Sequence, residues 1–89
     1  MATVILSHKV LDYAKWRPIY DSDIQRRKDA GFTNEKVYRE ADDPNHIYII
    51  ADVTDPKILA GMMADPKLAE KMAEGGVVGE PSLTILYPA

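Results

Sequence analysis

Cysteine is absent from this chain of 89 residues, and histidine occurs only at His8 and His46. Without thiols the protein cannot form disulfides, thiolate zinc sites or a cysteine nucleophile. The two histidines lack any spacing typical of a metal site, so we expect no bound metal. No glycine-rich loop matches a phosphate or dinucleotide fingerprint, and no serine lies in a nucleophile elbow. The sequence therefore predicts no cofactor and no nucleotide chemistry.

Basic clusters and long apolar runs are also missing. Eleven basic against fourteen acidic residues give a formal charge of -3, which provides no electrostatic attraction to nucleic acid or anionic lipid. The apolar runs are far shorter than the roughly 20 residues of a membrane span, and no signal peptide is visible. We expect a cytoplasmic protein with neither nucleic acid nor membrane as a partner.

The length fits a single domain, predicted over residues 1–89. A chain this short buries only about 60 to 65% of its extended surface, and its net stability is a few kcal/mol. Association with a second copy would therefore stabilise it materially.

The first part of the chain predicts a strand over residues 4–10 and then a helix. Asp12 is a good N-cap, and Gly31 suits the left-handed position after the helix. Pro18 should kink this helix or move its start toward Arg17. The basic segment 26–28 is interpreted as a solvated helix end. One helical face carries residues at spacings of three and four: Tyr13, Trp16, Tyr20, Ile24 and Arg27.

The second part predicts strands over residues 35–40, 46–53 and 82–87, with a turn at 42–45. Between the last two strands, Pro56 and Pro66 each follow an aspartate that can cap a helix, which predicts two short helices or one sharply broken helix. The glycine-rich segment 75–81 is expected to be a flexible connection, either a plain linker or a lid.

The predicted order is strand, helix, strand, strand, helix, strand, which is the pattern of an α+β, ferredoxin-like βαββαβ fold with a four-stranded antiparallel sheet. Right-handed crossovers place the first and third strands at the centre and the helical layer on one face. Because the central strands are apolar on both faces, the uncovered face calls for a partner. We therefore expect a homodimer in which two sheets form an α+β barrel.

Simple alternation along the strands predicts one polar face, on which four side chains lie together: His8, Tyr48, Asp52 and Thr84. The opposite face, with Ile5 and Ile47, fits a dry dimer core. If the polar face meets the helical stripe of Tyr13, Trp16 and Tyr20, an aromatic cavity results. The same stripe is also compatible with an ordinary hydrophobic core.

His8 is the principal candidate for chemistry, because an imidazole on a rigid strand can hold or pass a proton near neutral pH. In a catalytic interpretation, His8 acts as general base or acid and Tyr48 orients or protonates an oxygen. Trp16 and Tyr20 stack on the substrate, and Tyr13, Asp52 and Thr84 complete the binding site. The alternative for His8 is a hydrogen-bonded structural histidine.

The chain resembles the dimeric α+β-barrel superfamily, which includes antibiotic-biosynthesis monooxygenases, small polyketide cyclases and stress-responsive barrel proteins. The resemblance spans nearly the whole chain and is carried by Val10-Leu11-Asp12-Tyr13 with Trp16, by Arg39 with Asp42-Asp43-Pro44-Asn45, and by Gly76-Val77-Val78-Gly79-Glu80-Pro81. It implies the fold, the dimer and a ligand site between helices and sheet. One fold hosts many functions, so the reaction does not follow from it.

Two departures from the superfamily restrict the chemistry. Its cofactor-free monooxygenases use a tryptophan on the third strand with an asparagine nearby, whereas this chain has Tyr48 on that strand and its sole tryptophan is Trp16. Its haem-degrading members bind iron through a histidine on the second helix, and residues 47–89 contain no histidine. The resemblance thus disfavours haem degradation by that arrangement.

Two functional hypotheses follow. In the first, the homodimer binds a small apolar, cyclic or aromatic molecule, with cofactor-independent oxygenase or cyclase activity. In the second, it is a noncatalytic stress-related or ligand-binding dimer whose aromatic stripe is core. The second predicts packed Trp16 and Tyr20 and no cavity above roughly 100 Å³, below the usual range of ligand sites.

Overall fold

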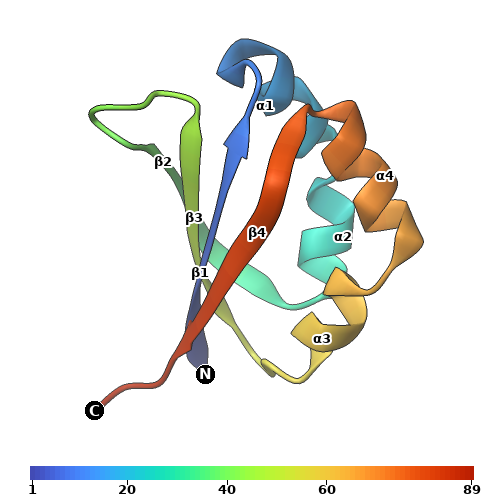
Figure 1. The fold of residues 1–89 in the computed structure, drawn as a ribbon. Helices are drawn as coiled ribbons and strands as arrows, with labels where there is room; N and C mark the ends of the chain where they lie inside the picture. Colours follow the sequence, from blue (N-terminus) through green and yellow to red (C-terminus); the bar gives the residue numbers. More distant parts are fainter.

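In the computed structural model, which describes residues 1–89, four antiparallel strands form one sheet in the order β2-β3-β1-β4 (Figure 1). The strands are β1 (Ala2–Val10), β2 (Phe32–Arg39), β3 (His46–Val53) and β4 (Val77–Leu86). The predicted α+β ferredoxin-like fold is confirmed, including the central position of the first and third strands. β3 pairs with β2 and β1, and β1 pairs with β3 and β4, so these two strands form the middle of the sheet.

All helices lie on one side of the sheet (Figure 1), as the sequence predicts. They are α1 (Tyr13–Ser22), α2 (Ile24–Asp29), α3 (Ile58–Met63) and α4 (Pro66–Glu74). None is long and apolar enough to cross a membrane.

The first helical region begins as expected but breaks at a different residue. Asp12 caps α1, and its carboxylate accepts a hydrogen bond from the Ala14 backbone N–H at 3.0 Å. The expected shift of the start toward Arg17 is wrong, because α1 begins at Tyr13 and continues through Pro18. The break lies at Asp23, where the backbone leaves the helical region before α2 starts. Gly31 has φ 86°, the left-handed conformation predicted for it.

The second helical region consists of two short helices, the first of the two predicted alternatives. Asp65 caps α4 by accepting from the Lys67 N–H at 2.9 Å, with Pro66 at the first helical position. The expectation of a linker or lid over 75–81 is wrong from Val77 onward, because residues 77–81 belong to β4. There Val77 and Val78 pair with Val10 and Lys9 of β1, which extends the strand beyond the predicted 82–87.

Strand register contradicts the predicted division of the faces. His8 of β1 lies opposite Ile47 of β3, so even positions of β1 share a face with odd positions of β3. The expectation that His8, Tyr48, Asp52 and Thr84 share one face is therefore wrong. Simple alternation assumes that even-numbered residues of all strands point to the same face, which holds only when paired residues are both even or both odd. Here the loop lengths pair even-numbered residues of β1 with odd-numbered residues of β3 and β4.

The face beneath the helices forms the hydrophobic core. Its fully buried residues include Val4, Ile47, Val53 and, from α3, Leu59. The other face, which we call the open face, is not the dry surface that was expected. It mixes apolar and polar side chains in rows that cross the sheet: Tyr38, Tyr48, Ser7 and Ser82 in one, and Lys36, Ile50, Ile5 and Thr84 in the next.

Candidate functional site

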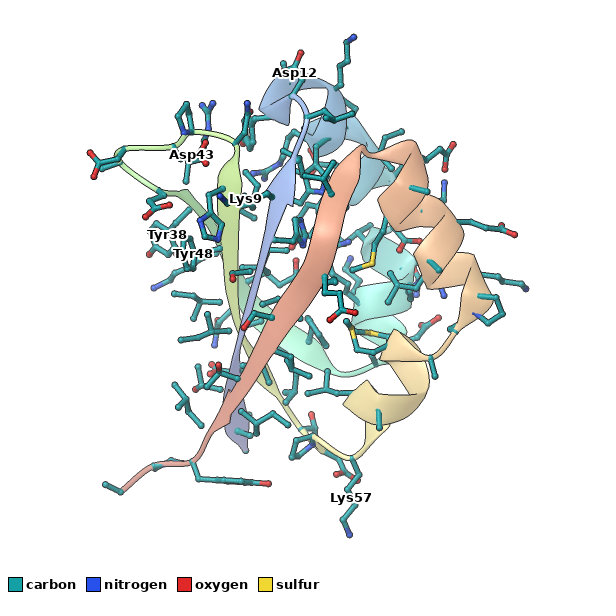
Figure 2. The ribbon with its side chains drawn as sticks, viewed as in Figure 1. Lys9, Asp12, Tyr38, Asp43, Tyr48 and Lys57 are labelled. Carbon is teal, nitrogen blue, oxygen red and sulfur yellow. The ribbon has the colours of Figure 1, made fainter.

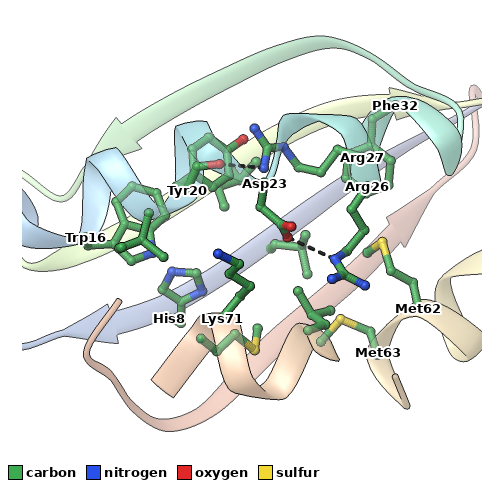
Figure 3. Close-up of a pocket in the computed structure, with 15 residues that line it drawn as sticks. His8, Trp16, Tyr20, Asp23, Arg26, Arg27, Phe32, Met62, Met63 and Lys71 are labelled. Atoms are coloured by element: carbon green, nitrogen blue, oxygen red, sulfur yellow. Dashed lines mark hydrogen bonds and ion pairs between the residues drawn. The ribbon is translucent and has the colours of Figure 1, made fainter. Parts of the chain in front are cut away.

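A cavity of about 70 Å³ lies between the sheet and the helices (Figure 3). Leu6 and Ile49 form its floor on the sheet, and Phe32 closes one side. Its helical wall is formed by Leu68 and by three unbranched side chains, those of Met62, Met63 and Met72. The volume exceeds the roughly 15 Å³ that one water needs but is below the 300 Å³ at which ordinary ligand pockets begin. The volume is also below the roughly 100 Å³ that the noncatalytic hypothesis gives as its upper limit.

His8 lines this cavity from the middle of the sheet and is only 7% exposed. Neither Nδ1 nor Nε2 has a hydrogen-bond partner, although both atoms are buried. Burial, with a smaller contribution from the positive charge of His46, lowers the pKa of His8 to about 4. His8 is therefore neutral at pH 7 and has one N–H donor and one lone pair to offer. The expected structural alternative, a hydrogen-bonded histidine, does not describe it.

The helical aromatic stripe meets His8 as predicted. Trp16 is 3% exposed and contacts the His8 ring edge-on, with 5.5 Å between ring centroids. Tyr20 stacks on Trp16 at 4.8 Å and also lines the cavity, whereas Tyr13 contacts Trp16 but does not reach the cavity. Gly75 packs so closely on this group that a Cβ there would lie 3.0 Å from Trp16 Cδ1. The stripe is thus both core and cavity wall.

Charged side chains surround the cavity, and the sequence interpretation missed them. Arg27, expected to be solvated, is 7% exposed; its Nε donates to both Glu35 oxygens at 3.0 Å and its guanidinium stacks on Tyr20. The signal was present, because Arg27 continues the helical spacing of the aromatic stripe. The Tyr20 hydroxyl donates to Glu35 at 2.8 Å, and burial together with this contact raises the pKa of Tyr20 above its ordinary value.

Arg26 and Lys71 complete the charged surroundings. Arg26 donates to Asp23 at 2.9 Å and to Asp65 at 2.8 Å, which joins the start of α2 to the cap of α4. Lys71 of α4 lines the cavity as well, and its one ion-pair partner is Glu74 at 3.4 Å. Nothing in the sequence pattern singled out Lys71, except that it stands beside Met72 at the edge of the apolar stripe of α4.

Three of the predicted site residues lie away from this cavity. Tyr48, Asp52 and Thr84 are on the open face, and Figure 2 shows Tyr48 beside Tyr38 on the side of the sheet that no helix covers. Asp52 accepts hydrogen bonds from Asn34 and Thr3, both at 3.0 Å, and these contacts lower its pKa. The structure thus brings His8, Trp16 and Tyr20 together at the cavity, leaves Tyr13 in contact with Trp16 outside it, and places the other three on the opposite face.

Metal-ligand types do not gather anywhere in the chain. No group of three or more His, Asp or Glu side chains is arranged to hold a metal ion. His46, at the start of β3, pairs with Glu40 at 2.8 Å and packs on the Tyr48 ring. Because the two arginines of the cavity wall are already paired with carboxylates, the polar groups available to a ligand in the cavity are the His8 imidazole and the Lys71 ammonium.

Solved structures with the same fold cover essentially the whole chain. An antibiotic biosynthesis monooxygenase matches with a TM-score of 0.72 and 15% identity, covering 100% of this chain and 99% of the other. SnoaB, a cofactor-independent oxygenase from Streptomyces nogalater, matches with a TM-score of 0.70 and 18% identity over 99% and 94% of the two chains. A conserved protein from Methanosarcina mazei Go1 matches with a TM-score of 0.69 and 16% identity over 94% and 88%.

These likenesses concern the fold. No family model matches the sequence, and no curated protein sequence matches it. The chain thus shares with monooxygenases of this type its strand order and helical layer, while most of its residues differ from theirs. Any shared chemistry has to be argued from the cavity itself.

Proposed function

We propose that this protein binds a small apolar, cyclic or aromatic molecule in the cavity around His8 and acts on it without a cofactor, as an oxygenase or a cyclase. The observation that carries the proposal is the His8 ring, whose two nitrogens are buried and unpartnered at the cavity wall. A buried polar group without a protein partner costs stability unless a bound molecule or an ordered water satisfies it, and catalytic groups are among those found in this state.

The proposed chemistry starts from neutral His8. Its lone pair accepts a proton from a carbon or oxygen acid of the substrate, and Trp16 and Tyr20 hold the ring system. In a cyclisation, the resulting enolate carbon attacks a carbonyl of the same molecule, and the new alkoxide takes the proton back. In an oxygenation, dioxygen reacts with the enolate, converts a CH₂ group to C=O and leaves its second oxygen as water. A substrate anion beside His8 raises the low pKa of the imidazole, which makes the proton transfer feasible.

The small size of the cavity requires its wall to move. Three of its lining residues are methionines, whose unbranched side chains adapt to different shapes: Met62, Met63 and Met72. They lie on the short helices α3 and α4, and the contact between Arg26 and Asp65 joins α2 to the N-terminal cap of α4. We therefore expect the ligand to enter by displacing methionines rather than by moving the sheet.

The test combines ligand detection with turnover. Native mass spectrometry of the purified protein reports a copurified molecule, and oxygen consumption and product analysis are then measured on it and on a panel of phenols and 1,3-diketones. We expect His8→Phe to lower kcat at least 100-fold, the range of general acid-base catalysis. The matched control is His46→Phe, the other histidine, which should stay within about twofold of the wild type. Unchanged turnover in His8→Phe contradicts the proposed role.

A noncatalytic ligand-binding or stress-related dimer is the second candidate, and the cavity volume of about 70 Å³ favours it. In this candidate the space around His8 holds ordered water, which satisfies both ring nitrogens. Absence of turnover over the whole panel, with no copurified molecule, would support it. A cytoplasmic location stays a prediction from the sequence in either case.

We also propose that the protein is a homodimer that pairs through the open face. Ile5 and Ile50 lie side by side at its centre, and Tyr38, which is 50% exposed, lies opposite Tyr48. Apolar side chains at the centre of a sheet face that no helix covers favour contact with a second copy. In sedimentation velocity, Ile50→Lys should give a monomer, whereas Ile58→Lys, on exposed α3, should stay dimeric. A monomeric wild type at micromolar concentration would refute the dimer.

A further inference from the structure

Charge is distributed unevenly around the cavity. Three cationic side chains line it, Arg26, Arg27 and Lys71, against one carboxylate, that of Asp23. Two of these cations are already neutralised: Arg26 by Asp23 and Asp65, and Arg27 by Glu35, all at 3.0 Å or less. One positive charge at the cavity, that of Lys71, has no such close partner.

Lys71 differs from the two arginines in how it is held. Its ammonium lies 3.4 Å from Glu74, one helical turn away on the solvent side of α4, and both side chains are well exposed. An exposed pair of this kind is worth about 0 to 1 kcal/mol, so Lys71 can exchange Glu74 for another anion at little cost. In Figure 3 the Lys71 side chain rises from α4 between His8 and Asp23 as seen in this view.

The rest of the lining is apolar apart from His8. Phe32, Met62 and Met63 form the end of the cavity near Arg26, and Trp16 forms the other wall (Figure 3). A ligand that satisfies this lining has an apolar body, one group that can hydrogen-bond to neutral His8, and a single negative charge. A second negative charge would find no free cation.

We propose that the ligand is a small monoanionic amphiphile, an aryl or alkyl carboxylic acid, whose carboxylate pairs with Lys71 and accepts a hydrogen bond from the His8 N–H while its apolar body lies against Trp16 and the methionines. This inference rests on the proposed ligand site and specifies its substrate class. Lys71 is thus the specificity-determining residue, and His8 is the polar contact beside it.

Trp16 makes the test direct, because it is the only tryptophan of the chain and lines the cavity. Its emission is titrated with 3-phenylpropionate, with the uncharged 3-phenylpropionamide, and with 3-phenylpropylamine. These probes share the phenyl body and differ in the charge of the head. We expect the acid to bind at least tenfold more tightly than the amide, and the amine to bind most weakly.

Variants assign the preference to one side chain. Lys71→Met, which keeps an unbranched apolar stem, should remove the difference between acid and amide, and Lys71→Arg should retain most of it. Lys67→Met, an exposed lysine on the same helix, is the matched control and should behave as the wild type.

The outcomes separate the two proposals. If acid and amide bind equally, or Lys71→Met keeps the preference, the carboxylate inference is overturned while the ligand site stands. If none of the probes alters Trp16 emission in the wild type or in Lys71→Met, the inference and the ligand site both fail. Circular dichroism of each variant confirms that it is folded, so that a lost preference reports on charge.

Discussion

The two faces of the sheet differ in how many polar side chains they carry. Beneath the helices, polarity is almost eliminated, and the exceptions are His8, without a partner, and Arg27, paired with Glu35. On the open face, polar and apolar side chains alternate in rows, and Asp52 has both of its hydrogen bonds within that face or at its edge. A polar group without a hydrogen-bond partner in the protein is therefore an exception on the covered face. On the open face such a group can hydrogen-bond to water.

This contrast supports both proposals, a ligand site beneath the helices and pairing of two copies through the open face. A buried imidazole without hydrogen bonds is costly, and its place beside a cavity makes that cavity the candidate site. The isoleucines and tyrosines of the open face are typical of the apolar, aromatic-rich core of a protein interface.

The largest expected effect comes from Ile47, which is fully buried on the covered face. Ile47→Ala should lower the free energy of unfolding by about 2 to 5 kcal/mol, because it removes buried methyl groups and leaves a cavity. Ile50→Ala, three residues along the same strand on the open face, should cost less than about 1 kcal/mol at low protein concentration. Urea unfolding followed by circular dichroism measures both.

If Ile47→Ala is too unstable to purify, Ile47→Val serves instead, with an expected loss of about 0.5 to 1.5 kcal/mol. The cost of Ile50→Ala should rise with protein concentration, because a dimer loses interface contacts as well. Equal, concentration-independent losses at both positions would contradict the distinction between the faces.

An intermediate effect is expected from the titration of His8. Its pKa is lowered from 6.5 to about 4 in the folded protein, so the unfolded chain binds the proton more readily. His8 therefore contributes stability above pH 6.5 that is lost as the pH falls through the folded pKa. Between pH 7 and pH 5 we expect the free energy of unfolding to fall by about 2 kcal/mol on this account.

Variants that cannot titrate isolate the contribution of His8. The free energy of unfolding of His8→Phe and of His8→Gln should each depend less on pH over this range than that of the wild type. The measurement is urea unfolding at half-unit pH steps. A wild type and variants with the same pH dependence would mean that the folded His8 is solvated and not enclosed.

Most of the fold follows from local signals in the sequence. The caps at Asp12 and Asp65 and the glycine at 31 mark helix ends through short-range hydrogen bonds and backbone conformation, and all three are found as predicted. The break of the first helix was misplaced because Pro18 is a strong signal, yet the helix accommodates it and Asp23 ends α1 instead. β4 was predicted too short because Gly79 and Pro81 favour a loop, whereas pairing with β1 favours a strand.

One part of the candidate site also follows from local signals in the sequence, and the other part does not. His8, Trp16 and Tyr20 come together because one strand and the following helix place them by their own periodicities. Tyr48, Asp52 and Thr84 were assigned to the same face by parity, but parity between strands depends on register, which no single segment encodes. Lys71 was missed because the role proposed for it depends on which charges around it are already neutralised, a property of the tertiary structure alone.

The smallest expected effect concerns Tyr48, which the sequence placed in the catalytic pair with His8. Because Tyr48 lies on the open face, Tyr48→Phe should leave the affinity for 3-phenylpropionate, read from Trp16 emission, within about twofold of the wild type, or roughly 0.4 kcal/mol. His8→Phe, measured in the same titration, should weaken binding by at least tenfold. If Tyr48→Phe weakens binding as strongly as His8→Phe, the two faces are coupled, and the partner sheet of a dimer would have to transmit the change to the cavity. The twofold limit therefore tests whether chemistry and assembly are separated by the thickness of one sheet.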